Sequence, residues 1–285
     1  MLSKPKIAVI YTHFPHYRRA VFEAMTRSDT YLFEFFYDPK GVDQTIASGY
    51  AEENHHSLQV HKIGKLMWQK GAIGRALSSE YDGYIFLGNP FILSTWPSAM
   101  LARLRRRPVF FWTHGWLRHD SGIKSALRNV FYSLANGLMV YGDRAREIGS
   151  ARGYPIDNIH VIKNSLDYET QARTRDLYLA RSEPSIAIDT LPTKPFFLIV
   201  ARLVSSVEVD IAIEAMARIH QEVALVVVGD GPQRGSLEVQ ARDLEVEVHF
   251  LGAIYDETRL GRLFMNAQAV VSPGKVGLLA IHALT

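Results

Sequence analysis

Three short loops in the second half of the 285-residue chain contain residues that suit phosphate binding. Arg202 follows the apolar run "FFLIV", Gly231 and Pro232 follow "ALVVV", and Lys275 lies in the glycine-flanked stretch "SPGKVG". An arginine at a strand end can form bidentate hydrogen bonds to phosphate oxygens, and the backbone N–H groups at the start of a helix favour the binding of an anion. Each loop taken alone is also ordinary turn chemistry. Together, after three different strands, they predict one edge of a phosphate-binding cleft.

Loops in the first half place further polar side chains at predicted strand ends. His114 directly follows the hydrophobic run "FFWT", where a histidine can contact a substrate, assist proton movement, or form a hydrogen bond within its loop. The stretch "HFPHYRR" follows the first strand, and "VIKNSLD" ends a later one. The residues predicted on this side of the site are His13, Pro15, Tyr17, Arg18 and Asn164. We predict no metal site, because no third ligand follows the histidines at a recognisable spacing.

The elements that must position these residues alternate between short apolar runs and helical periodicity. The strands predicted in the first half are 6–12, 31–37, 84–88, 108–113, 137–142 and 159–164, with helices such as 122–135 between them. Such alternation is typical of a parallel α/β fold, in which strands buried on both faces expose their carboxyl ends to ligands.

A change of composition divides the chain. Residues 171–195 lose the alternation and gather charge and proline, and a second strand–helix series begins at Phe196. We therefore predict a first Rossmann-like domain over 1–182, a linker over 183–194 and a second domain over 195–285. Two such domains with parallel sheets facing one another create a cleft at the carboxyl ends of their strands.

Composition excludes several classes of protein. The chain is 47% hydrophobic and has no cysteine, so disulfides, thiolate nucleophiles and cysteine metal sites are excluded. No segment has the length and apolarity of a membrane span or a secretory signal. Residues 1–182 contain 24 Lys and Arg against 16 Asp and Glu, whereas the rest contains 8 against 13. A basic first half suits anionic lipid or a phosphorylated ligand.

The densest basic cluster is "RLRRRP", 103–108, at the predicted end of a helix. Cations at a helix C-terminus also complement its dipole, so this cluster has a structural explanation as well as a membrane-surface one. No nucleic-acid-binding motif accompanies it, and we predict no nucleic-acid partner.

Taken in order, these motifs resemble the group 1 nucleotide-sugar glycosyltransferases (glycosyltransferase family 4), which have the two-domain GT-B fold. The resemblance rests on "FFLIVARLV", "VDIAIEAM", "ALVVVGDGPQRGSLEVQA", "VHFLG" and "AVVSPGKVGLLAIHAL", with "THFPHYR", "WTHGW" and "VIKNSLD" in the first half. It implies transfer of a sugar from a UDP-, GDP- or similar donor, with retention, without metal or cofactor. The donor would lie on the second domain and the acceptor on the first.

The resemblance also implies roles for individual residues. Arg202 matches the arginine that binds the donor diphosphate, Gly231 lies in the loop beneath the nucleotide, and His114 matches the histidine that contacts the transferred sugar. Both Arg202 and His114 are therefore expected to take part in catalysis. Lys275, Gly277 and His282 fall in the motif that completes the donor site.

The chain departs from the family pattern at several positions. Ala201, Val207 and Glu208 stand where the family has glycine, lysine and glycine, so one phosphate-binding cation is missing. The family's two glutamates fall on Gly274 and His282. We expect Lys275 to supply the missing cation and His282 to replace a glutamate at the donor ribose. Because family members continue for another strand–helix pair or two, we expect the second domain to be incomplete.

The function predicted from the sequence is that of a retaining hexosyltransferase-type enzyme in cell-surface polysaccharide or glycolipid biosynthesis, such as that of lipopolysaccharide. It would act on a glycan or polyprenyl-linked acceptor in the cytoplasm, as a peripheral protein at the inner face of the cytoplasmic membrane. One alternative is a catalytically incompetent nucleotide-sugar-binding remnant. Another is a GT-B-fold sugar-nucleotide epimerase, which needs no acceptor.

Overall fold

The structure, a computed structural model, describes residues 3–41, 54–164, 166–180 and 192–285, without the side chain of His16. Its contacts divide the chain into two compact units, Met1–Asn164 and Ser165–Thr285. This division falls earlier than the predicted boundary at 182. Most of the predicted linker, 183–194, lies outside the described residues. No helix among the described residues is long and apolar enough to cross a bilayer.

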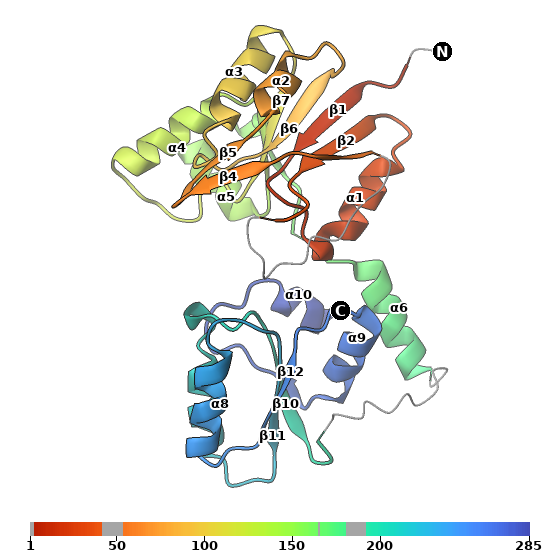
Figure 1. The fold of residues 1–285 in the computed structure, drawn as a ribbon, viewed down its shortest axis with the longest axis vertical. Helices are drawn as coiled ribbons and strands as arrows, with labels where there is room; N and C mark the ends of the chain where they lie inside the picture. Colours follow the sequence, from red (N-terminus) through yellow and green to blue (C-terminus); the bar gives the residue numbers. More distant parts are fainter. Residues whose placement is uncertain (1–2, 42–53, 165, 181–191) are drawn as a thin grey trace. The chain divides into compact units, whose positions relative to one another are not determined.

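The first unit is built on a seven-stranded parallel sheet (Figure 1), which confirms the predicted α/β class. In spatial order its strands are β3 (His55–Ser57), β2 (Leu32–Tyr37), β1 (Lys6–Ile10), β6 (Gly83–Leu87), β7 (Val109–Thr113), β8 (Gly137–Val140) and β9 (Ile159–Val161). Its helices are η1 (His16–Arg18), α1 (Arg19–Thr26), α2 (Ala72–Leu77), α3 (Thr95–Leu104), α4 (Ile123–Ser133), α5 (Asp143–Ala151) and η2 (Ile156–Asn158).

Both faces of this sheet are buried, which explains the nearly continuous apolar strands. Successive residues of β1 alternate between two cores: Ala8 and Ile10 face one, and Val9 faces the other. Helices α2 to α5 cover the first core, and α1 covers the second through Phe22 (Figure 1). The carboxyl ends of β1, β7 and β8 therefore meet at one edge, as the sequence predicted.

An antiparallel hairpin in the first unit was not predicted. Strands β4 (Val60–Ile63) and β5 (Leu66–Gln69) pair around a two-residue loop that begins with Gly64. Gly64 has a φ of 58°, which suits the primed turns of such hairpins. The spacing of the two strand segments around a glycine is therefore the feature of the sequence that indicates this hairpin, although neither segment is strongly apolar.

The second unit contains a four-stranded parallel sheet within the described residues. Its spatial order is β12 (Val248–Gly252), β11 (Ala224–Val228), β10 (Phe196–Val200) and β13 (Ala269–Val270). The helices are α6 (Tyr168–Leu179), η3 (Ser205–Val207), α7 (Val209–Met216), α8 (Arg234–Asp243), α9 (Glu257–Asn266) and α10 (Leu279–Leu284). Helices α7 and α8 pack on one face of the sheet and α9 on the other (Figure 1).

Helix α6 belongs to the second unit, although the prediction from the sequence assigned its residues to the first domain. The Asp167 carboxylate caps this helix by accepting the Thr170 N–H at 3.1 Å. The helix then packs on α9, where the Tyr178 hydroxyl lies 3.1 Å from Asn266 Oδ1. Because α6 has many charges and little apolar periodicity of its own, only this tertiary packing shows that it belongs to the second unit.

Candidate active site

Loops at the carboxyl edge of the second sheet are joined by backbone hydrogen bonds. The Ala201 N–H donates to the Val228 carbonyl at 3.0 Å, and the Leu203 N–H donates to the Asp230 carbonyl at 3.0 Å. The Gln233 N–H returns to the Leu203 carbonyl at 3.1 Å. The loops after β10 and β11, which carry Arg202 and Gly231, therefore form one assembly, as a shared site requires.

Glycine is required where these two loops touch. Gly229 has a φ of 131°, and a Cβ atom built on it would lie 1.8 Å from the Ala201 carbonyl oxygen. A Cβ on Gly231 would lie 2.4 Å from the Leu203 carbonyl oxygen. The Gly231 N–H already donates to Asp230 Oδ1 at 2.7 Å. The primary task of this glycine pair is close loop packing, and a carboxylate already occupies the predicted anion-binding N–H.

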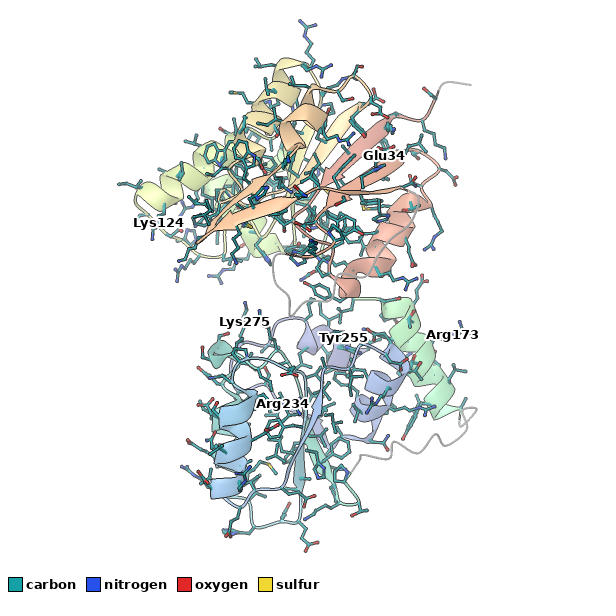
Figure 2. All side chains as sticks on the ribbon, viewed as in Figure 1. Glu34, Lys124, Arg173, Arg234, Tyr255 and Lys275 are labelled. Carbon is teal, nitrogen blue, oxygen red and sulfur yellow. The ribbon has the colours of Figure 1, made fainter. Side chains whose placement is uncertain are left out.

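The loop after β13 is held against η3. The Gly274 N–H donates to the Val207 carbonyl at 3.0 Å, and the Lys275 N–H donates to the Ser206 carbonyl at 2.9 Å. Lys275 thus lies directly beside the segment that lacks the family's lysine at Val207, and its side chain is exposed at this edge of the unit (Figure 2). Arg202 is also exposed on the loop that leads into η3.

The departures at 207 and 274 are part of the packing. Val207 is a buried core residue, 7% exposed, so a lysine could not replace it without disturbing that core. A Cβ atom on Gly274 would lie 2.6 Å from the Ser206 carbonyl oxygen. The close approach that brings Lys275 to η3 therefore excludes the glutamate that the family carries at this position.

Glu208 occupies a backbone conformation that suits glycine, with φ 58° and ψ 41°. A left-handed conformation costs a non-glycine residue about 1–2 kcal/mol. Replacing Glu208 by glycine removes this strain, but part of the gain in stability is lost because glycine is more flexible in the unfolded chain. We expect Glu208→Gly to raise the free energy of unfolding by about 0.5–1 kcal/mol in urea denaturation. Glu214→Gly, within α7, is the control and should lower it by about 1 kcal/mol. Equal losses in both variants would contradict the assigned strain.

The side chain of His282 is largely buried in the second unit, with 11% of its surface exposed. Its ring stacks on Phe264 with centroids 4.4 Å apart, and Nε2 lies 3.4 Å from Glu257 Oε2. Burial lowers the pKa of His282 to about 4, and burial raises the pKa of Glu257. The imidazole is therefore neutral near pH 7 and takes part in the packing of α10 on α9. Gly277 is exposed, with a φ of 59°.

The shifted pKa of His282 predicts a pH-dependent contribution to stability. Because its folded pKa lies near 4 and its ordinary value is 6.5, the contribution is complete above pH 6.5 and is lost as pH falls toward 4. We compare the free energies of unfolding of the wild type and His282→Gln. The advantage of the wild type should be smaller at about pH 4.5 than at about pH 7.5. Glu257, with its raised pKa, acts in the opposite sense in both proteins. A constant difference would show that His282 titrates normally.

The first unit brings His114 and Arg18 together through Tyr141. The exposed His114 ring packs edge-on against the Tyr141 ring, with centroids 4.8 Å apart. Arg18 donates a hydrogen bond to the Tyr141 hydroxyl, and its guanidinium lies over the rings of Tyr141 and Trp112. Sequence reasoning missed these two aromatic residues, although each is the next-to-last residue of a predicted strand.

The remaining predicted residues lie on nearby loops of this unit. Pro15 is buried, and its carbonyl accepts the Arg18 N–H at 3.0 Å. Nδ1 of His13 lies 3.3 Å from the Thr12 hydroxyl. Tyr17 is partly buried, and burial raises its pKa. Asn164 is the last residue of the first unit. Within the described ranges, no group of three or more His, Asp or Glu residues could hold a metal ion.

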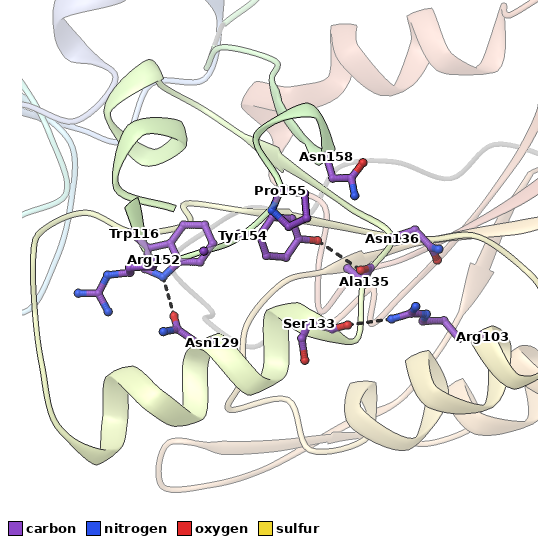
Figure 3. Close-up of a pocket in the computed structure, with 11 residues that line it drawn as sticks. Arg103, Trp116, Asn129, Ser133, Ala135, Asn136, Arg152, Tyr154, Pro155 and Asn158 are labelled. Carbon is purple, nitrogen blue, oxygen red and sulfur yellow. Dashed lines mark hydrogen bonds between the residues drawn. The ribbon is translucent and has the colours of Figure 1, made fainter. Parts of the chain in front are cut away.

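A cavity of about 420 Å³ in the first unit lies away from these residues (Figure 3). The cavity lies between α4 and the segment that follows α5, and none of the predicted site residues lines it. Its polar groups are largely engaged: Trp116 Nε1 donates to Asn129 at 2.9 Å, and Arg103 donates to the Ser133 carbonyl at 2.8 Å. We do not include it in the candidate site.

Residues 184–284 match the family model "Glycosyl transferases group 1". No curated protein matches the chain. Among solved structures, lipopolysaccharide outer core galactosyltransferase WaaB in its apo form is 17% identical, with a TM-score of 0.60, over 98% of this chain and 78% of that one. Anabaena Alr3699/HepE in complex with UDP is 18% identical, with a TM-score of 0.65 and the same coverage.

A third similar structure is a UDP-N-acetylglucosamine 2-epimerase from Rickettsia bellii. It is 16% identical, with a TM-score of 0.62, over 99% of this chain and 76% of that one. At these identities the structures establish the fold alone, which is GT-B with two Rossmann-like units, and the match to the family model lies within the second unit, over 184–284.

Proposed function

We propose that the chain transfers a sugar from a nucleotide-sugar donor to a hydroxyl group of a glycan or lipid-linked acceptor, with retention of configuration. The observation that carries this proposal is the loop assembly at the carboxyl edge of the second unit, within the segment that matches the family. Two exposed cations, Arg202 and Lys275, lie on loops that backbone hydrogen bonds connect through η3. The solved structures that share the fold include one that binds UDP and UDP-glucose, which favours a UDP-sugar.

The proposed chemistry follows from the charge of the leaving group. Departure of a nucleoside diphosphate concentrates negative charge on its phosphate oxygens, and fixed cations beside it lower the barrier. Arg202 would supply a planar, bidentate contact and Lys275 a point charge. In a retaining transfer the leaving phosphate takes the proton of the acceptor hydroxyl, so no carboxylate base is needed. His114 on the first unit would contact the transferred sugar.

The direct test is a titration of the full chain with UDP, GDP and their sugars, followed by product analysis with candidate acceptors. A ligand at 100 times its Kd should raise the free energy of unfolding by about 2.7 kcal/mol. Donor binding with turnover only when an acceptor is added supports a transferase. Conversion of donor alone to its epimer would identify an epimerase, which the similarity to the Rickettsia bellii enzyme keeps as the second candidate. Binding without turnover would identify a remnant, and absence of binding would overturn the proposal.

Lys275 should contribute to donor affinity as the substitute for the missing lysine. We expect Lys275→Ala to weaken UDP binding by about 10-fold, because a charge-assisted hydrogen bond contributes about 1.5–3 kcal/mol when partly shielded from water. Calorimetric titration of UDP measures the effect. Arg242→Ala is the control, since Arg242 lies at the end of α8, which leads away from the loop edge. An unchanged affinity in Lys275→Ala would rule out this role.

We further propose that the first unit contacts an anionic membrane in the cytoplasm through α4 and the end of α3. The outward face of α4 carries Ile123, Leu127 and Val130, which are 88%, 53% and 56% exposed. Lys124 lies beside them at the tip of the helix (Figure 2). Such a combination of apolar and basic side chains suits the surface of an anionic bilayer.

The basic cluster at the end of α3 divides into two roles. Arg105 donates to the Ser78 carbonyl at 3.1 Å, and Arg107 pairs with Asp82 at 2.8 Å. These two arginines hold the end of α3 to neighbouring elements, which supports the structural explanation for them. Arg103 is exposed but also donates to the Ser133 carbonyl at 2.8 Å, so Arg106 is the exposed arginine of this cluster that we assign to the lipid surface.

Introducing charge on α4 should reduce membrane binding selectively. We expect Ile123→Glu combined with Leu127→Glu to lower binding to vesicles containing phosphatidylglycerol by about 10-fold or more. The burial of two apolar side chains at the interface is lost, and two negative charges that the anionic lipid repels are introduced. Vesicle co-sedimentation measures it. Val239→Glu, on the exposed side of α8, is the matched control. If the α4 variant still sediments like the wild type, the assigned surface is wrong.

A further inference from the structure

Arg18 is a buried cation in the first unit. It is 9% exposed, and its guanidinium carbon lies 5.3 Å from the centre of the Trp112 ring and 5.0 Å from that of Tyr141. Among the residues that the structure describes, its side chain donates to the Tyr141 hydroxyl and pairs with no carboxylate. A guanidinium carries several N–H donors, and burial without a counterion is costly. Aromatic faces offset part of that cost but leave donors unused.

Two further polar groups in contact with this arginine have no partner in the described part of the chain. Trp112 Nε1 and the Tyr11 hydroxyl are both buried and make no hydrogen bond there. Trp112 and Tyr11 are 5% and 3% exposed, and their ring centres are 5.7 Å apart. Burial raises the pKa of Tyr11 well above its usual range, so its hydroxyl remains protonated and able to donate. The group is rich in donors and has no negative charge.

The position of these residues connects them to the candidate active site. Tyr11 directly follows β1, Trp112 is the next-to-last residue of β7, and Tyr141 directly follows β8. They therefore gather at the carboxyl edge of the sheet, where α/β folds bind ligands. The Tyr141 ring also packs against His114, with centroids 4.8 Å apart. A group bound at Arg18 would lie one aromatic ring away from His114.

We propose that Tyr11, Arg18, Trp112 and Tyr141, here called the Arg18 cluster, bind an anionic group of the acceptor, a phosphate or a carboxylate, and so select charged acceptors over neutral sugars. The inference rests on the proposed function, which supplies the acceptor. An anion would neutralise the buried guanidinium and accept hydrogen bonds from the unpaired donors around it, and such charge-assisted bonds are strong where water is excluded. A neutral sugar would leave the charge uncompensated.

The test compares two probes that differ in one anionic group. Glucose 1-phosphate and methyl α-glucoside are titrated into the full chain with UDP present at saturation, so that phosphate cannot occupy the donor loops. We expect glucose 1-phosphate to bind the wild type about 10-fold or more tightly than methyl α-glucoside. Arg18→Gln should weaken glucose 1-phosphate by about 10-fold or more, whereas Arg19→Gln, which alters the neighbouring exposed arginine, should bind like the wild type.

Further arms separate the sources of the anion and guard against misfolding. Equal affinity of the wild type for both probes, or unchanged glucose 1-phosphate binding in Arg18→Gln, would overturn the proposal. A matching loss of UDP affinity in Arg18→Gln would assign the anion to the donor diphosphate and overturn the acceptor assignment. If Arg18→Gln does not fold, Arg18→Lys and the wild-type comparison of the two probes decide the matter. If UDP does not bind the wild type, the proposed function itself is contradicted.

Discussion

Replacing Arg202 with alanine is expected to weaken UDP binding by about 10- to 150-fold, the largest effect on donor affinity that we predict. A hydrogen-bonded contact to a charged group contributes about 1.5–3 kcal/mol, and every 1.4 kcal/mol corresponds to about 10-fold in affinity. The backbone of the segment that contains Arg202 forms hydrogen bonds with the loops after β11 and β13. The substitution therefore removes a cation from the middle of this loop assembly. Calorimetric titration measures it.

Two companion variants make the Arg202 result interpretable. Arg202→Lys keeps the charge but loses the planar fork, so its affinity should lie between those of the wild type and Arg202→Ala. Arg242→Ala removes an exposed arginine from the end of α8 and should bind UDP like the wild type. If Arg202→Ala binds UDP normally while Lys275→Ala does not, the donor diphosphate lies along the β13 loop alone, and the assignment of Arg202 is wrong.

Gly229→Ala is expected to destabilise the second unit by roughly 2–4 kcal/mol, the largest effect on stability. The added Cβ would lie 1.8 Å from the Ala201 carbonyl oxygen, and the backbone has a φ of 131° that alanine rarely adopts. The loops after β10 and β11 must then separate, which would also displace Arg202 and reduce UDP affinity. Urea denaturation and UDP titration of the full chain measure the two consequences.

Gly235→Ala provides a matched control for this substitution. Gly235 lies in α8, and a Cβ atom there would meet no atom within 4 Å. Because alanine favours a helix more than glycine does, this variant should gain about 0.5–1 kcal/mol without a change in UDP affinity. Comparable losses in both glycine variants would mean that the close approach at Gly229 is not a constraint on the loop.

Local patterns were sufficient for the strands that carry the site. The strands predicted at 6–12, 137–142 and 159–164 begin where β1, β8 and β9 begin and extend two or three residues beyond them, and the other three predicted strands lie within one residue of β2, β6 and β7. Tyr11 and Thr12, just after β1, still share backbone hydrogen bonds with Phe36 and Asp38, so the pairing with the β2 segment continues slightly past the end of the strand. Buried β-branched and aromatic runs give such a strong signal because both of their faces pack against helices.

Patterns failed where a segment depends on its neighbours. Helix α6 has no apolar stripe of its own, and it is held by contacts such as the one between Tyr178 and Asn266 on α9. The stacking of His282 on Phe264, from α9, was likewise not predicted from the sequence. Such contacts join residues far apart in the chain, so no local spacing announces them.

By itself, the sequence determined that this protein is a two-unit parallel α/β chain with cations on loops that follow different strands, because periodicity and turn residues act locally. The tertiary structure alone decided how those residues meet. It placed the Lys275 backbone on Ser206, showed that Gly229 and Gly274 are fixed by close backbone approach, and enclosed Arg18 between Trp112 and Tyr141. These arrangements depend on parallel strands ending at a common edge, where loops distant in sequence come into contact.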